Sequence, residues 1–148
     1  MSQKRAELDS PEVKKAIKET EALVSQMKTK GPSNFSPAYA HIEKAVTYYK
    51  NAGYDLDTLF PAKRGVARFK AAKTGEDYWN VFSKLLHEKI CDPNGELVKL
   101  VDKGVKLTAP IVFTFMLASF NIPVAAISII VGITAILVEN GIQAYCKL

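Results

Sequence analysis

A histidine and a cysteine four positions apart come closest, of all the spacings in this chain, to a metal site. In the segment His87-Glu88-Lys89-Ile90-Cys91, the first and last residues would share one helix face, as the two zinc ligands of an HExxH motif do. Together with His41 and Cys146 they make four potential zinc ligands. The paired short spacings of structural zinc sites are absent, so we expect no metal. We interpret Cys91 and Cys146 as small hydrophobic residues.

Paired carboxylates are the other candidates for a catalytic role. Asp55 and Asp57 flank a single leucine, and Glu76 is adjacent to Asp77. Each pair is better explained as acidic residues at the start of a helix, where they complement the helix dipole. The sequence has no glycine-rich phosphate loop and no nucleophile elbow. We therefore predict that the protein is not an enzyme and has no catalytic residue and no cofactor.

A basic segment, Ala62 to Lys73, contains no acidic residue and carries an apolar side formed by Val66 and Phe69. Its cations are Lys63, Arg64, Arg68, Lys70 and Lys73. A basic amphipathic helix of this kind suits an anionic membrane surface. The alternative is a solvated face of an ordinary bundle helix. Nucleic acid is a less expected partner, because no nucleic-acid-binding motif accompanies the charge.

The most prominent structural signal in the sequence is one uncharged run, Leu107 to Val138. In the whole chain, 24% of residues are charged. A run of this length must be buried away from water, either in a bilayer or in a protein core. Strands are disfavoured because polar and apolar residues do not alternate and alanines recur. We predict two helices, Thr108 to Phe120 and Ile122 to Val138, joined by a tight turn at Asn121-Ile122-Pro123. The expected membrane-inserting residues are Ile111, Val112, Phe113, Phe115, Phe120, Ile127, Ile130, Ile133 and Leu137.

Helix length does not decide between bilayer and core. At about 1.5 Å per residue the two predicted helices span roughly 20 Å and 25 Å, against about 30 Å of hydrocarbon. Lys99, Lys103 and Lys106 precede the run and would mark the cytoplasmic end of an inserted segment. Ala125, Ser128 and Gly132 place small residues along one face. In lipid such a face would allow homo-oligomers, and in water it would simply fill a tight hairpin interface.

The remaining sequence predicts amphipathic helices. Ser10-Pro11 and Ser36-Pro37 are helix-start signals, with turn-forming residues from Gly31 to Pro37 between them. The basic helix should end near Gly75. A strongly amphipathic helix should follow and stop before the turn Asp92 to Gly95. The fold class is therefore all-α, with amphipathic helices packed around a C-terminal hydrophobic hairpin.

Length and composition favour one domain. The chain has 148 residues, 48% of them hydrophobic, and a formal net charge of +5. Residues 1–106 would form the amphipathic helices and residues 107–148 the hydrophobic hairpin. This plan is similar to that of the soluble forms of pore-forming colicins and of Bcl-2 proteins, although no motif of either family occurs here. Two cysteines give no disulfide framework. The first ten residues lack an apolar stretch, so we expect no cleavable signal and a cytoplasmic protein.

These patterns lead to one functional prediction and one alternative. The prediction is a non-enzymatic protein that associates with or inserts into anionic membranes, with its hairpin buried in the soluble state. The most specific form of this prediction is a pore-forming effector. The alternative is a soluble helical adaptor or scaffold that binds another protein.

Overall fold

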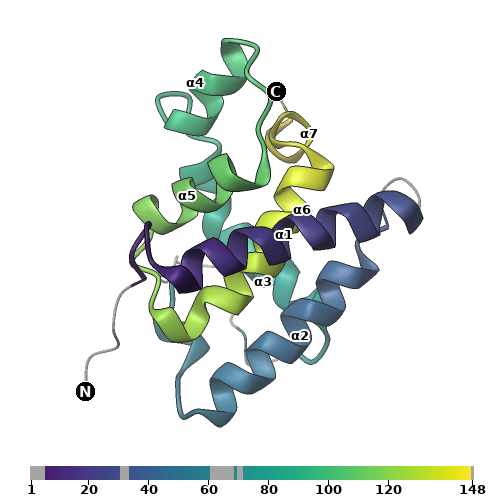
Figure 1. Cartoon of the computed structure of the whole chain (residues 1–148), viewed down its shortest axis with the longest axis vertical. Helices are drawn as coiled ribbons and strands as arrows, with labels where there is room; N and C mark the ends of the chain where they lie inside the picture. Colours follow the sequence, from purple (N-terminus) through teal and green to yellow (C-terminus); the bar gives the residue numbers. More distant parts are fainter. Residues whose placement is uncertain (1–5, 31–33, 61–68, 70–71, 148) are drawn as a thin grey trace.

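The computed structural model describes residues 6–30, 34–60, 69 and 72–147, and the regular structure within these ranges is helical (Figure 1). The long elements are α1 (Pro11–Lys30), α2 (Ser36–Asn51), α3 (Gly75–Ile90), α5 (Ala109–Ser119) and α6 (Ile127–Asn140). The short elements are η1 (Leu56–Thr58), α4 (Glu96–Asp102), η3 (Val124–Ala126) and α7 (Ile142–Cys146). The all-α prediction is confirmed for the described part of the chain.

Helix α6 lies at the centre of the molecule. Figure 1 shows α1 crossing in front of it, and α6 packs mainly against α1, α2 and α5. The sequence explains this arrangement, because α1 and α2 each have a single apolar stripe to cover whereas α6 has no charged residue before Glu139. The apolar stripe of α2, as helical spacing in an amphipathic helix predicts, is buried and consists of Ala38, Ile42, Ala45, Val46 and Tyr49.

Two helix boundaries test the start signals in the sequence. Helix α1 begins at Pro11, and Ser10 Oγ accepts a hydrogen bond of 3.3 Å from the Val13 amide, as the Ser10-Pro11 signal predicts. The basic helix expected to end near Gly75 lies mostly outside the described residues, and Gly75 itself begins α3. Its amide donates to Glu43 Oε1 at 3.0 Å, and a Cβ at this position would collide with the Tyr39 carbonyl group. A glycine is needed there because the start of α3 lies directly against the backbone of α2.

The connection between α5 and α6 is longer than the predicted tight turn. Helix α5 ends at Ser119, the turn η3 intervenes, and α6 begins at Ile127 and not at Ile122. Asn121 is exposed and provides no side-chain cap for η3 or α6. Ile122 is buried, and its carbonyl oxygen accepts a 2.8 Å hydrogen bond from the Ala6 amide. Burial of Ile122 under the N-terminal segment therefore replaces the helical start predicted for this residue.

Candidate functional site

Helix α6 is enclosed on every side over most of its length. All residues from Ile129 to Leu137 are buried, which places Ile130, Ile133 and Leu137 of the predicted inserting set in the core. The closest packing is against α2, since a Cβ on Gly132 would lie 2.5 Å from Ile42 Cγ1. This small-residue position, predicted to serve helix packing or oligomers, contacts α2 inside the molecule. The absence of charge from Ile127 to Val138 of α6 is thus accounted for by the fold.

The N-terminal turn of α6 is attached to α2 by a histidine. His41 Nε2 lies 2.9 Å from the carbonyl oxygen of Ser128 and 3.1 Å from its hydroxyl. Ser128 is exposed, whereas its neighbours Ile127 and Ile129 are buried. His41 was a potential zinc ligand in the sequence, and the structure gives it a positioning contact to α6.

Helix α5 is equally uncharged but has one face in solvent. The exposed residues Pro110, Thr114 and Ala118 recur every fourth position and form an outward stripe. The inward residues are Ala109, Val112, Phe113, Phe115, Met116 and Leu117. Of the predicted inserting residues in this region, Val112, Phe113 and Phe115 are buried, and Ile111 and Phe120 are half-buried. We call Pro110, Thr114 and Ala118 the outward stripe of α5.

An open groove of about 920 Å³ runs between α5 and the end of α3. Its apolar part includes Leu85, Phe115 and Phe120, and the Lys89 ammonium lies 5.9 Å from the centre of the Phe120 ring. The charged or polar residues that line it are His87, Glu88, Lys89, Asp92, Glu96 and Ser119. Cys91 also lines this groove. The groove combines an aromatic surface with a mixed-charge border.

Cys91 and Cys146 form a disulfide, with their Cα atoms 5.5 Å apart. The prediction that they act as small unpaired hydrophobic residues is wrong. The bond joins the end of α3 to the end of α7 and closes a sequence separation of 55 residues. Disulfides persist mainly in oxidising compartments, so this bond gives no support to the cytoplasmic location expected from the sequence.

Tyr145 holds α7 to α3 beside the disulfide. Its hydroxyl donates a 2.7 Å hydrogen bond to the Ser83 carbonyl oxygen and accepts one of 3.3 Å from the Ser83 hydroxyl. Its ring centre lies 6.1 Å from that of Trp79 and 5.2 Å from that of His87. Burial raises the pKa of Tyr145, and the hydrogen bond from Ser83 partly opposes that rise. The sequence does not point to Tyr145, because an isolated tyrosine outside any motif carries no recognisable signal.

The carboxylate pairs serve the helix starts, as the sequence indicated. Asp55 Oδ1 accepts a 2.9 Å hydrogen bond from the Asp57 amide at the start of η1. Asp77 forms a capping box with Thr74 at the start of α3. Hydrogen bonds from the Lys73 and Thr74 amides lower the pKa of the Asp77 carboxyl. Among the described residues, no group of three or more histidine, cysteine or acidic side chains could hold a metal ion.

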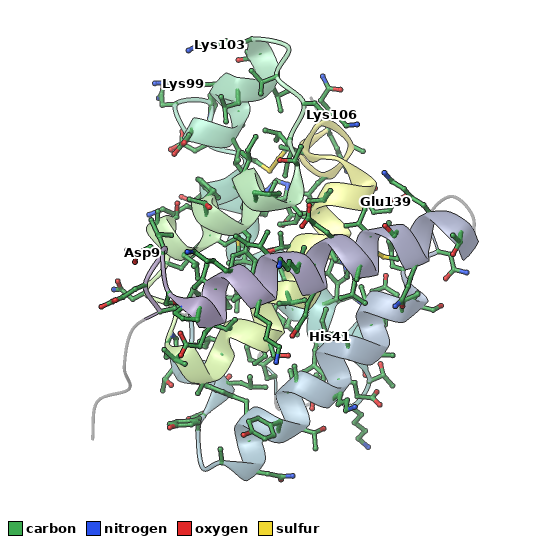
Figure 2. All side chains as sticks on the ribbon, in the orientation of Figure 1. Asp9, His41, Lys99, Lys103, Lys106 and Glu139 are labelled. Atoms are coloured by element: carbon green, nitrogen blue, oxygen red, sulfur yellow. A yellow bond between two sulfur atoms is a disulfide. The ribbon has the colours of Figure 1, made fainter. Side chains whose placement is uncertain are left out.

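Most of the predicted anionic-surface site lies outside the described residues. That applies to Lys63, Arg64, Arg68 and Lys70. Lys73 is exposed, and its backbone amide donates to Asp77 Oδ2 at 3.1 Å. Phe69 is buried and packs against Phe82, with ring centres 4.7 Å apart, as expected for the apolar side of this segment. A second group of lysines, Lys99, Lys103 and Lys106, is exposed near the α4 end of the molecule (Figure 2).

Two findings bear on how these features can be interpreted. Within the described ranges, no helix combines the length and the apolar character needed to cross a bilayer. Comparison of the chain with protein-family models, curated proteins and solved structures finds no match.

Proposed function

We propose that this protein is a non-enzymatic, membrane-associating helical bundle that stores the uncharged segment Leu107–Val138 in its folded state. The observation that carries the proposal is the outward stripe of α5. Solvent-facing positions of a bundle helix are normally charged or strongly polar, and a charge at Thr114 or Ala118 would cost the fold little. The stripe is nevertheless neutral, which favours contact with a low-dielectric phase.

The stored segment must rearrange if it is to enter a bilayer deeply. Helices α5 and α6 have 11 and 14 residues. At about 1.5 Å per residue they span roughly 16 Å and 21 Å, which is shorter than the ~30 Å hydrocarbon layer. We infer that α5 makes the first contact at the interface. Helix α6 would follow only when α1 and α2 separate from it, and α5 and α6 would then act together as the predicted hairpin.

The lysines near α4 give the approach an electrostatic component. Lys99, Lys103 and Lys106 are exposed and precede α5 in the sequence. Each cation near an anionic surface contributes about 1 kcal/mol, and the contribution decreases with salt. Glu96 and Asp102 lie in the same segment, so the attraction is modest. We therefore propose that the lysines orient the protein at the membrane surface. Most of the affinity for the membrane would come from the apolar segment.

Flotation with vesicles of equal parts phosphatidylcholine and phosphatidylglycerol tests the proposal. Thr114→Asp and Ala118→Asp should leave thermal stability nearly unchanged but reduce vesicle binding at least about 10-fold, since charge at membrane depth costs up to ~3 kcal/mol. Asn80→Asp, on an exposed position of α3, adds the same charge away from the stripe and should bind like the wild type. Absence of wild-type binding at every pH and salt tested, or equal binding by all four proteins, would remove the proposal.

A soluble adaptor is the second candidate, and the groove beside α5 is the observation that favours it. Charged residues around an aromatic floor resemble the polar border and apolar centre of a protein interface more than a lipid-binding surface. In that case the protein should remain a monodisperse monomer without detergent, and lipid should not change its melting. Phe120→Ser would then weaken binding of the protein partner, while Thr114→Asp would have no effect on vesicle flotation.

A further inference from the structure

We propose that the Cys91–Cys146 disulfide is a reducible latch. A dithiol reductant would open it through the groove beside α5, and the opening would detach α7 and loosen the C-terminal end of α6. The last step rests on the proposed function, because it gives the stored segment its route out of the bundle. The attachment of α7 is a property of the folded protein and stands independently of any membrane.

The position of α7 makes the latch effective. Helix α7 follows α6 directly, with only Gly141 between them, and this glycine has a φ of +89°. Of the five residues of α7, only Ile142 is fully buried. The disulfide, the Tyr145 hydrogen bond to Ser83 and the Tyr145 ring contacts are therefore the main attachments of α7 to α3. Breaking the disulfide removes the single covalent member of this set.

The two ends of α6 differ in how they are held. The N-terminal turn is attached to α2 through the His41 contact with Ser128. At the C-terminal end, Val138 and Glu139 are half-buried and Asn140 is exposed, so packing weakens towards α7. The disulfide compensates for that weakness by connecting the chain just beyond α6 to α3. Opening should accordingly begin at α7 and proceed towards the centre of α6.

Access to the bond is provided on the Cys91 side. Cys91 and Cys146 are both half-buried, and of the two only Cys91 lines the groove of about 920 Å³. A thiolate entering the groove can attack Cys91 Sγ. The S–S bond then breaks, Cys146 leaves as a thiolate that takes a proton from water, and a mixed disulfide forms at Cys91.

The second thiol of the reductant completes the reaction. It attacks the reductant's own sulfur in the mixed disulfide, which releases Cys91 as a thiolate that is then protonated. Two electrons pass to the protein, and the dithiol becomes a disulfide. The latch would therefore be closed in an oxidising compartment and open after entry into a reducing one.

Hydrogen exchange of the full-length protein, before and after treatment with dithiothreitol, tests the latch. Amides of Ile142–Cys146 and of the last turn of α6 should exchange roughly 30-fold faster or more after reduction, which corresponds to the lower end of the stabilisation that a disulfide typically gives. Amides of α2 should change less. Cys146→Ser should exchange like the reduced wild type and should not respond to dithiothreitol. If that variant does not fold, the comparison of oxidised and reduced wild type suffices.

Three results separate failure of the latch from failure of the proposed function. Labelling of two free thiols by iodoacetamide in the folded, untreated protein would overturn the latch. Unchanged exchange of α7 after confirmed reduction would also overturn it. Faster exchange of α7 without any increase in binding to phosphatidylglycerol-containing vesicles would support the latch and contradict the release of α6 to membranes. Faster exchange with increased binding supports both.

Discussion

Helices α5 and α6 derive from the same uncharged run, yet the fold treats them differently. Helix α6 is surrounded by α1, α2 and α5 and is buried from Ile129 to Leu137. Helix α5 buries one face and exposes Pro110, Thr114 and Ala118. Folding alone requires α6 to be apolar on all sides, but it does not require this of α5. Only the uncharged residues that remain in solvent, on α5, are left unexplained by folding, and these residues bear on function.

The largest expected effect comes from placing a charge in each helix. Ile130→Asp buries an unpaired carboxylate in α6 and should lower the free energy of unfolding by more than about 4 kcal/mol, a large fraction of the stability of a typical small domain. Thr114→Asp in α5 should change it by less than about 0.5 kcal/mol. Urea denaturation followed by circular dichroism measures both. Similar losses for the two variants would mean that α5 is as enclosed as α6.

Tight packing of α6 against α2 gives the next effect. Gly132→Ala should destabilise the protein by about 1–3 kcal/mol, because the added methyl group would lie 2.5 Å from Ile42 Cγ1 in a fully buried contact. The matched change in α5, Ala118→Leu, enlarges an exposed side chain and should alter stability by less than about 0.5 kcal/mol. Thermal melting of both variants checks the difference. A neutral Gly132→Ala would show that α2 and α6 can move apart easily.

The attachment of α7 at the end of α6 predicts a smaller effect. Tyr145→Phe removes the hydrogen bond to Ser83 and should cost about 0.5–1.5 kcal/mol. Tyr48→Phe, at a tyrosine that is 73% exposed, is the matched control and should cost nothing measurable.

The same tyrosine predicts how stability depends on alkaline pH. Because its folded-state pKa is raised above the usual value of about 10, its contribution is fully present below that pH. The contribution is then lost as pH rises through the folded pKa. Melting temperatures measured between pH 8 and pH 12 should decline less steeply for Tyr145→Phe than for the wild type. Parallel curves for the two proteins would contradict this role.

The smallest effect concerns the other end of α6. His41→Phe keeps the size of the side chain but removes the contact with Ser128, and should cost about 0.5–1 kcal/mol because the site is partly solvated. Hydrogen exchange at the first turn of α6 should increase, with little change in α5. An equal increase in both helices would show that they open as one unit.

The sequence predicted the parts of the fold that depend on local signals. The start of α1 at Pro11 and the stripe of α2 followed from capping chemistry and helical spacing. The different burial of α5 and α6 could not be predicted. Apolar residues occupy every face of both helices, so the pattern does not show which face is buried. The start of α6 was misplaced because the contact of Ala6 with Ile122 joins residues far apart in sequence.

The disulfide was missed for a related reason. Cys91 and Cys146 are separated by 55 residues, and only the placement of α7 against α3 brings them together. Two cysteines in a chain of this length are compatible with a bond or with two unpaired thiols, and no local feature distinguishes these states. The predicted inserting set contains no residue of the outward stripe of α5, because exposure is decided by tertiary packing.

The central position of α6 has a consequence for how the protein is made. Its main partner, α1, comes much earlier in the sequence. Helix α1 therefore leaves the ribosome before α6, and more than a hundred residues are translated before α6 is complete. At about 5–20 residues per second, this delay lasts roughly 5–20 seconds. During that interval the apolar side of α1 lacks its main native partner and has only its smaller contacts with α2 and α5 to form. We therefore expect the nascent chain to depend on a cellular holding factor, and to aggregate when it is translated without one.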